Sequence, residues 1–118
     1  MKLFLSCLLC LLILLAAIPA SASNPQPVEK EWTFMVFLNG DNNLDSYGTL
    51  DMEEMQKVGS TNQVNIVVLR DTNEDATSSK IYYIDKGKQT MVKDYGSNID
   101  MGDWHTLVDF FKYAKEAG

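Results

Sequence analysis

Two oxygen-rich stretches of this 118-residue sequence have residue types and a spacing that could bind a divalent cation. Asp41-x-Asn43-x-Asp45 and Asp71-x-Asn73-x-Asp75 each place three oxygen-bearing side chains at alternate positions, as the first ligands of an EF-hand loop do. Such a loop also needs glycine at its sixth position and a bidentate glutamate at its twelfth. Other residues hold those positions: Ser46 and Met52 in the first stretch, Ala76 and Tyr82 in the second. Turns and helix caps are therefore the favoured interpretation, and the metal ligands stay unknown.

The side chains that could act in catalysis do not form a complete set. His105 is the only histidine, and no serine lies in a G-x-S-x-G nucleophile elbow. The two cysteines, Cys7 and Cys10, lie within an apolar N-terminal run. Three carboxylates on one predicted helix are interpreted as its solvated face: Asp51, Glu53 and Glu54. The sequence consequently assigns no catalytic residue and no cofactor-binding residue to this chain.

The loop Asn39–Asn43 is the best functional position in the chain. It directly follows the run Trp32–Leu38, which is apolar on both faces, as the central strands of parallel sheets are. Open α/β sheets place their binding and catalytic groups at the carboxyl ends of such strands. Position alone selects this loop.

The elements that must position the loop follow from the hydrophobic pattern. Leu44–Val58 predicts a helix that ends at Gly59, and Val64–Leu69 predicts a second buried strand. A strand, a helix and a strand joined by short polar connections predict a right-handed βαβ unit. The predicted apolar face of the helix consists of Leu44, Tyr47, Met55 and Val58.

The second half of the chain predicts a hairpin and a helix. After a polar loop at Asp71–Ser79, residues 80–84 and 89–93 predict antiparallel strands joined across residues 85–88. The last predicted helix covers Asp103–Ala117, with Asp103 as its N-cap. Its predicted apolar face consists of Leu107, Phe110, Phe111 and Ala114. The predicted fold class is α/β with a mainly parallel sheet.

The first 22 residues predict a cleavable secretory signal peptide. Lys2 precedes the apolar run Leu3–Ile18, and Ala20-Ser21-Ala22 gives the small-x-small pattern of a cleavage site. A membrane anchor is the alternative, but the run is shorter than the roughly 20 residues that cross a bilayer. Residues 23–31 then form a flexible lead-in, and residues 32–118 form the N-terminal portion of a domain. We expect the protein to be secreted, periplasmic or on the cell surface.

The composition restricts the partners of the mature chain. The full sequence has a net charge of −6, and loss of the leader with Lys2 makes the chain more acidic by one unit. Both cysteines leave with the leader, so the mature part cannot form a disulfide. An acidic chain without a basic cluster argues against nucleic acid and anionic membranes. Calcium and cationic substrates remain compatible with it.

Several stretches, taken in order, resemble the clostripain family of secreted cysteine peptidases, which share a caspase-like fold. The stretches are Trp32–Leu44, Met52–Ser60, Val64–Leu69 and Asn98–Asp103, with Thr106–Phe110 after the last. They cover nearly all of the chain from Trp32. The sequence departs from the family pattern at Gly40, where alanine is expected, and at Trp104-His105, where Pro-Glu is typical.

The resemblance implies a three-layer αβα sandwich that is incomplete in this chain. It implies a thiol endopeptidase that cleaves peptide or protein substrates after Arg or Lys. The catalytic His and Cys of the family end two strands that would follow Gly118, so His105 is not the catalytic histidine. Relatives often depend on calcium, which makes calcium a possible cofactor of the full-length protein. The fragment alone is expected to be inactive.

Two other functions stay open. The protein could be a catalytically inactive relative that serves as a surface or binding protein, which downstream sequence without the His and Cys would indicate. It could also be a free-standing small secreted binding domain that is complete at Gly118. A stop codon directly after Gly118 would favour that second alternative.

Overall fold

The structure, a computed structural model, describes residues 29–73 and 79–117. The signal peptide and most of the lead-in predicted from the sequence lie outside these residues. The described elements are, in chain order, β1 (Trp32–Gly40), α2 (Asp45–Val58), β2 (Val64–Thr72), β3 (Lys80–Asp85), β4 (Lys88–Asp94) and α3 (Trp104–Ala117). Within the described part of the chain, no helix is long and apolar enough to cross a membrane.

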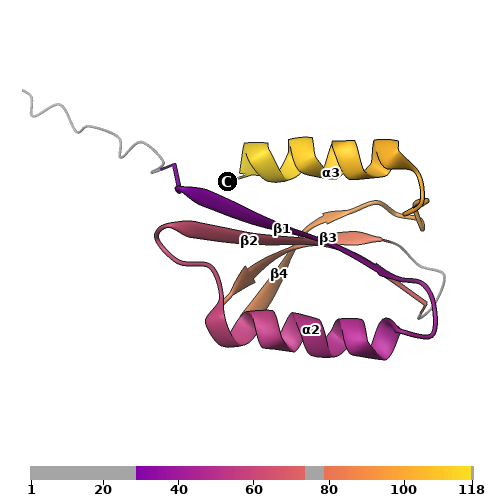
Figure 1. Ribbon diagram of the computed structural model, residues 1–118, viewed down its shortest axis with the longest axis horizontal. Coiled ribbons are helices and arrows are strands. Elements are labelled where there is room, and N and C mark those ends of the chain that lie inside the picture. The colour runs from indigo at the N-terminus through magenta and orange to yellow at the C-terminus, as the bar shows by residue number, and fades with distance from the viewer. Residues whose placement is uncertain (1–28, 74–78, 118) are drawn as a thin grey trace, which may run out of the picture.

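The strands form one sheet in the order β1-β2-β3-β4, with α2 on one face and α3 on the other (Figure 1). β1 and β2 are parallel, as the predicted βαβ unit requires, and Trp32 pairs with Val64. The pairings of β2 with β3 and of β3 with β4 are antiparallel. The fold is therefore mixed α/β. The prediction of a mainly parallel sheet is not met among the described strands, because the hairpin adds two antiparallel pairings to a single parallel one.

The apolar core is split by the sheet into two parts. Residues of β2 alternate between them: Val67 and Leu69 face α3, whereas Ile66 and Val68 face α2. On the α3 side the ring of Phe110 packs beside Phe37, with the ring centroids 6.2 Å apart. β2 thus has the two-faced burial that the sequence predicts for a central strand.

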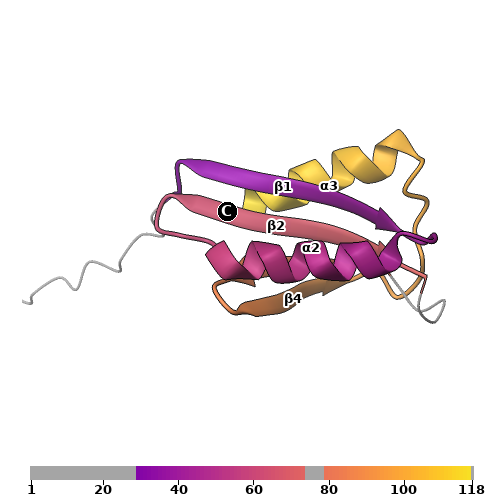
Figure 2. The ribbon, with the colours of Figure 1, turned by 60° about the horizontal axis from the view of Figure 1, so that its bottom comes forward.

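β1 is less buried than the sequence predicts. Within the described residues it pairs only with β2, and none of its residues except Gly40 is buried. Trp32 and Phe34 are 71% and 59% exposed. Met35 and Phe37 still pack toward α3, and Val36 and Leu38 pack toward α2, so both faces of β1 are partly covered as predicted. The edge of β1 away from β2 has no partner among the described residues. Figure 2 shows β1 at the margin of the sheet.

The helix α2 packs through a face that differs in part from the predicted one, of which Met55 does pack against the core. Its buried residues are Asp45, Gly48 and Met52, whereas Leu44, Tyr47 and Val58 of the predicted apolar face are exposed. Gly48 faces Leu38 of β1, and an added Cβ would make an ordinary contact with Leu38 Cδ2 at 3.4 Å.

The end of α2 is joined to the turn of the hairpin. The N–H of Ser60 donates to the carbonyl of Ile84 at 2.8 Å, and the N–H of Gly87 donates to the carbonyl of Gln56 at 2.8 Å. Gly59 has φ +69°, and any side chain there would collide with the backbone of Lys86. Glycine at position 59 therefore serves both the helix stop and this close contact.

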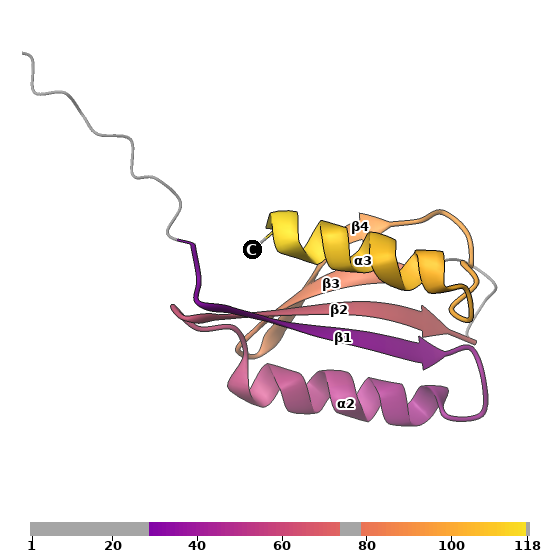
Figure 3. The ribbon, with the colours of Figure 1, turned by 45° about the horizontal axis from the view of Figure 1, so that its top comes forward.

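The helix α3 begins as predicted. The N–H of His105 donates to the carboxylate of Asp103 at 2.9 Å, which is the hydrogen bond of an N-cap residue. Phe110 and Ala114 of the predicted apolar face are buried, but Leu107 and Phe111 are 38% and 49% exposed. α3 runs opposite to β1, so its last turn lies near the start of that strand (Figure 3).

Candidate functional site

The loop after β1 lies at one rim of the sheet. β1 and β2 run parallel and in register, and the last pair of that register is Gly40 with Thr72. The amide group of Asn73 donates to the carbonyl of Asn42 at 2.9 Å and so joins the segments that follow the two strands. The Asn42 side chain accepts from the N–H of Leu44 at 2.8 Å. Hydrogen bonds therefore fix the loop that the sequence selects as the best functional position.

Asp45, the third oxygen ligand of the first candidate calcium stretch, instead forms a partly buried ion pair. Its Oδ1 lies 3.1 Å from Nη2 of Arg70, and the two side chains are only 10% and 13% exposed. The same Nη2 donates to Oγ1 of Thr49 at 2.8 Å. Sequence analysis missed this pair, although Arg70 is the only arginine in the chain and ends an apolar strand.

Asp71, from the second candidate calcium stretch, lies inside the fold. The sequence predicts that it begins a polar loop, but β2 continues through Thr72 because it pairs with the end of β1. Asp71 is 3% exposed, and its Oδ1 accepts from the hydroxyl of Ser79 at 2.9 Å. The hydroxyl oxygen of Ser79 in turn accepts from the N–H of Ile99 at 3.1 Å, which holds the segment before α3 against the sheet.

These contacts leave neither stretch with a ligand set for calcium among the described residues. The carboxylates of Asp45 and Asp71 already have Arg70 and Ser79 as partners. No group of three His, Cys, Asp or Glu side chains that could hold a metal ion occurs in the described part of the chain. Asp75 lies outside the described residues, and calcium dependence stays a prediction for the longer protein.

Gly40 is required by the close approach of β1 and β2 at the rim. A Cβ at this position would lie 2.6 Å from the carbonyl oxygen of Asp71 and 3.1 Å from Oδ1 of Asp45. Alanine, which the family pattern favours here, would therefore force the backbone apart. In the structure this glycine allows the two strand ends to lie at their observed distance.

A polar hollow of about 370 Å³ opens beside the loop. Every residue that lines it has a side chain ending in nitrogen or oxygen: Asn42, Asn43, Asp45, Ser46, Thr49 and Asn73. Such a lining can bind amide and carbonyl groups but contains no thiol or imidazole. The chemistry that this lining offers is recognition by hydrogen bonds.

His105 lies on the surface. Its Nδ1 lies 2.7 Å from Oδ1 of Asp103, and its ring stacks on Trp104 with the centroids 3.6 Å apart. Hydrogen bonds from the backbone N–H and the ring of His105 lower the pKa of the Asp103 carboxyl below its ordinary value of 3.8. Asp51, Glu53 and Glu54 are exposed on α2, in agreement with a solvated face.

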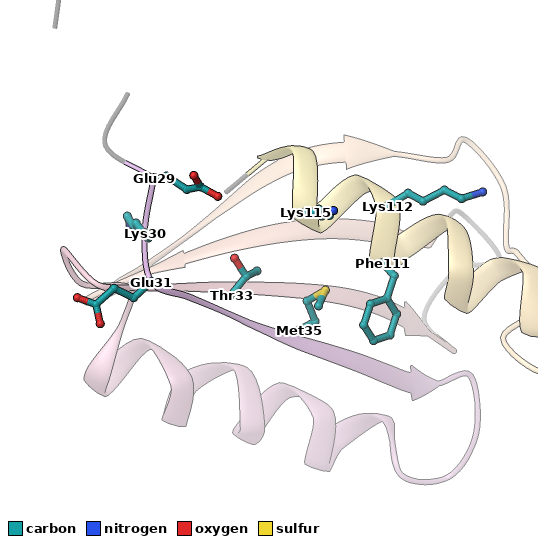
Figure 4. A pocket seen from close by; sticks show the side chains of 8 residues that line it. All are labelled: Glu29, Lys30, Glu31, Thr33, Met35, Phe111, Lys112 and Lys115. Carbon is teal, nitrogen blue, oxygen red and sulfur yellow. The ribbon is translucent and has the colours of Figure 1, made fainter. Parts of the chain in front are cut away.

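A second hollow, of about 440 Å³, lies at the opposite end of β1. Figure 4 shows Thr33 and Met35 on the strand and Phe111 on α3 around it, with Lys112 and Lys115 on the last turns of the helix. It follows the edge of β1 that has no partner among the described residues. It is therefore an uncovered margin of the sheet, far from the rim that carries the loop.

The comparisons with known proteins assign the chain to a family. The family model described as the clostripain family matches residues 36–117, which is well over half of the sequence. This chain belongs to the clostripain family. None of the curated proteins compared with it is detectably similar. The resemblance stated from the sequence is thus confirmed, and membership in a family of cysteine proteases supports a protease-like function for this clostripain-family chain.

Two solved structures have the same fold. A cysteine protease of B. fragilis is 20% identical, with a TM-score of 0.59 over 74% of this chain and 77% of that chain. A secreted C11 cysteine protease from Bacteroides thetaiotaomicron, solved with an irreversible peptide inhibitor, is 24% identical, with a TM-score of 0.62 over 75% of this chain. The match spans only 26% of that second protein.

Proposed function

We propose that this clostripain-family chain is the N-terminal part of a secreted cysteine endopeptidase that cleaves after Arg or Lys. The catalytic His and Cys lie in sequence that follows Gly118 in the complete protein. The family match over residues 36–117 is the observation that carries this proposal. The layers of helix, sheet and helix are extended by downstream elements into a caspase-like three-layer sandwich.

The share of one relative that the chain matches supports an active site outside this chain. The match covers about a quarter of the Bacteroides thetaiotaomicron protease, so most of such a protein lies outside the matched part. Past the predicted leader the chain contains no cysteine, and its one histidine is held by Asp103 at the surface. A thiol nucleophile must therefore come from elsewhere in the complete protein.

The open edge of β1 supports the placement of that active site. α3 ends near the start of β1, so a strand that follows α3 can run parallel to β1 along this edge. Its last residue would then lie at the same rim as Asn39–Asn43. Parallel strands bring their carboxyl ends together, so a histidine and a cysteine at the ends of two such strands would meet beside this loop.

The reaction follows from ordinary thiol chemistry at that rim. The Cys thiolate attacks the scissile carbonyl and forms an acyl-enzyme, and the His protonates the leaving amine. Water then hydrolyses the thioester and releases the second product. Carboxylates in the substrate pocket select Arg or Lys, because a buried cation needs an opposite charge. The polar hollow beside Asn42 binds main-chain groups of the peptide.

The test is an assay of the complete protein. It should hydrolyse reporters with Arg or Lys before the scissile bond at least tenfold faster than matched Ala or Glu reporters, and iodoacetamide should abolish the activity. Purified Ser23–Gly118 should hydrolyse none of them. A complete protein that lacks the downstream His and Cys, or is inactive on all reporters, would instead support a binding role. Turnover that titrates with Ser23–Gly118 would contradict the downstream placement.

A further inference from the structure

Arg70 is a partly buried cation at the rim, with its side chain 13% exposed. Its Nη2 contacts Asp45 at 3.1 Å and Thr49 at 2.8 Å, both in the first turns of α2. Arg70 itself stands near the end of β2, where it pairs with Leu38 of β1. One guanidinium therefore connects the start of the helix to the end of the central strand.

The Asp45–Arg70 pair is not expected to contribute much to the free energy of unfolding by itself. Burying two charges costs several kcal/mol per ion, and the attraction between them repays this only when the remaining donors are also satisfied. The Nε of Arg70 is buried and has no acceptor among the described residues. Apolar side chains of similar size would fill the same space without this cost. A buried pair of this kind is better suited to fixing one specific arrangement.

The arrangement fixed here is that of the functional loop. The loop Asn39–Asn43 is held at its start by Gly40, which is packed against the backbone of Asp71. At its end, the N–H of Asp45 donates to the carbonyl of Asn42 at 3.2 Å. Because Arg70 holds the Asp45 side chain, it determines where the loop ends relative to β2.

We propose that Arg70 is a positioning residue of the peptidase: through Asp45 and Thr49 it holds the loop Asn39–Asn43 in the position that substrate binding at the rim requires. This inference rests on the proposed function of the complete protein. The planar guanidinium serves this role better than an ammonium group, because its fixed geometry allows directed hydrogen bonds to a carboxylate and a hydroxyl at once. Lysine would keep the positive charge, but its ammonium group would not fix the directions of the two hydrogen bonds.

The experiment uses the complete protease and separates stability from positioning. Arg70→Met leaves Asp45 buried without a partner, whereas Arg70→Met combined with Asp45→Asn removes both charges. The single variant should melt at a lower temperature, and the double variant should recover most of that loss. Both should lose about 10- to 100-fold in kcat/KM on the Arg reporter, because small displacements of groups that position a substrate cost this much.

A control variant and a hydrogen-exchange measurement distinguish a loss of loop positioning from a loss of stability. Lys57→Met removes the exposed Lys57–Glu54 pair at the other end of α2 and should leave kcat/KM within about twofold of the wild type, as exposed pairs contribute little. Arg70→Lys should recover stability more fully than activity. Hydrogen exchange should show faster exchange at residues 39–45 in both Arg70→Met proteins, with β2 and β3 unchanged.

A double variant that regains wild-type activity together with stability would reduce Arg70 to a structural residue and overturn the inference. So would wild-type exchange at residues 39–45 in Arg70→Met. If the wild-type protein has no peptidase activity, the proposed function fails, and the hydrogen exchange of residues 39–45 still decides whether Arg70 holds the loop.

Discussion

The backbone of Gly40 lies so close to the backbone of Asp71 that an added Cβ would come within 2.6 Å of the Asp71 carbonyl oxygen. A contact of this length cannot be relieved by rotating a side chain, because the atom that must move belongs to β2. Glycine at position 40 therefore permits the close approach of the ends of β1 and β2, at the start of the loop that we assign to substrate binding.

Gly40→Ala and Gly48→Ala should have opposite effects on stability. Gly40→Ala should destabilise the complete protein by about 1–3 kcal/mol, the usual cost of overpacking. Gly48→Ala places its Cβ 3.4 Å from a flexible Leu38 methyl and should gain up to about 1 kcal/mol from helix propensity. Urea unfolding monitored by circular dichroism measures both. Equal losses in the two variants would contradict the close contact at Gly40.

The isolated chain Ser23–Gly118 should be aggregated or molten. Trp32 and Phe34 are largely exposed on a strand edge that carries no Lys or Pro. Each large apolar side chain left uncovered forfeits about 1.5–3 kcal/mol, against a net domain stability of about 5–15 kcal/mol. Light scattering and amide dispersion measure the outcome, and a chain extended through the downstream strands should fold cooperatively.

A matched pair of substitutions locates the source of that aggregation. Phe34→Lys, at the open edge of β1, should reduce scattering by Ser23–Gly118, because an edge lysine opposes strand pairing. Val92→Lys, on β4, should change it little, since that strand already carries Lys88 and Lys93. A sharp two-state melt of the unsubstituted short chain would instead support the small free-standing binding domain.

The start of α3 should be sensitive to acid. Because hydrogen bonds from His105 lower the pKa of Asp103, its carboxylate contributes stability that is present above the ordinary value of 3.8 and is lost as the pH falls through the lowered pKa. Asp103→Ala should therefore lower the melting temperature at pH 7, and the difference from wild type should shrink below pH 3.8. Asp109→Ala on the same helix is the control. A difference that is constant with pH would contradict this role of the ionised cap.

Export should remove the leader. When the full chain is expressed in a bacterium, the secreted protein should begin at Ser23, because Ala20-Ser21-Ala22 fits signal peptidase. Intact-mass measurement of secreted material gives the N-terminus directly. A protein that keeps Met1–Ala22 would point to the membrane anchor.

Much of the fold could be predicted because local patterns determine it. The two apolar runs predicted β1 and β2, the turn at Lys86 and Gly87 predicted the hairpin, and Asp103 predicted the start of α3. The face of α2 could not be predicted, because it depends on which neighbour allows a close approach. Exposed Leu44 and buried Gly48 reverse the usual relation between hydrophobicity and burial.

The candidate site was predicted in position but not in its contacts. The rule that sites lie at the carboxyl ends of parallel strands selected Asn39–Asn43 correctly as a rim loop. The partners of Asp45 and Asp71 were missed because Arg70 and Ser79 are distant from them in sequence or lie across a loop. A lone arginine at the end of an apolar strand is the signal that could have found the first pair, since a buried cation needs a carboxylate.

The two attachments of α2 have a mechanical consequence. Its last turn is bonded to the hairpin through Gln56 and Gly87, and its first turn is held to β2 through Arg70. A helix that is bonded at both ends is held against rotation relative to the sheet when substrate binds. Among the described residues, we therefore expect an opening at the rim to occur as a hinge motion of the four residues between β1 and α2, while the helix keeps its position.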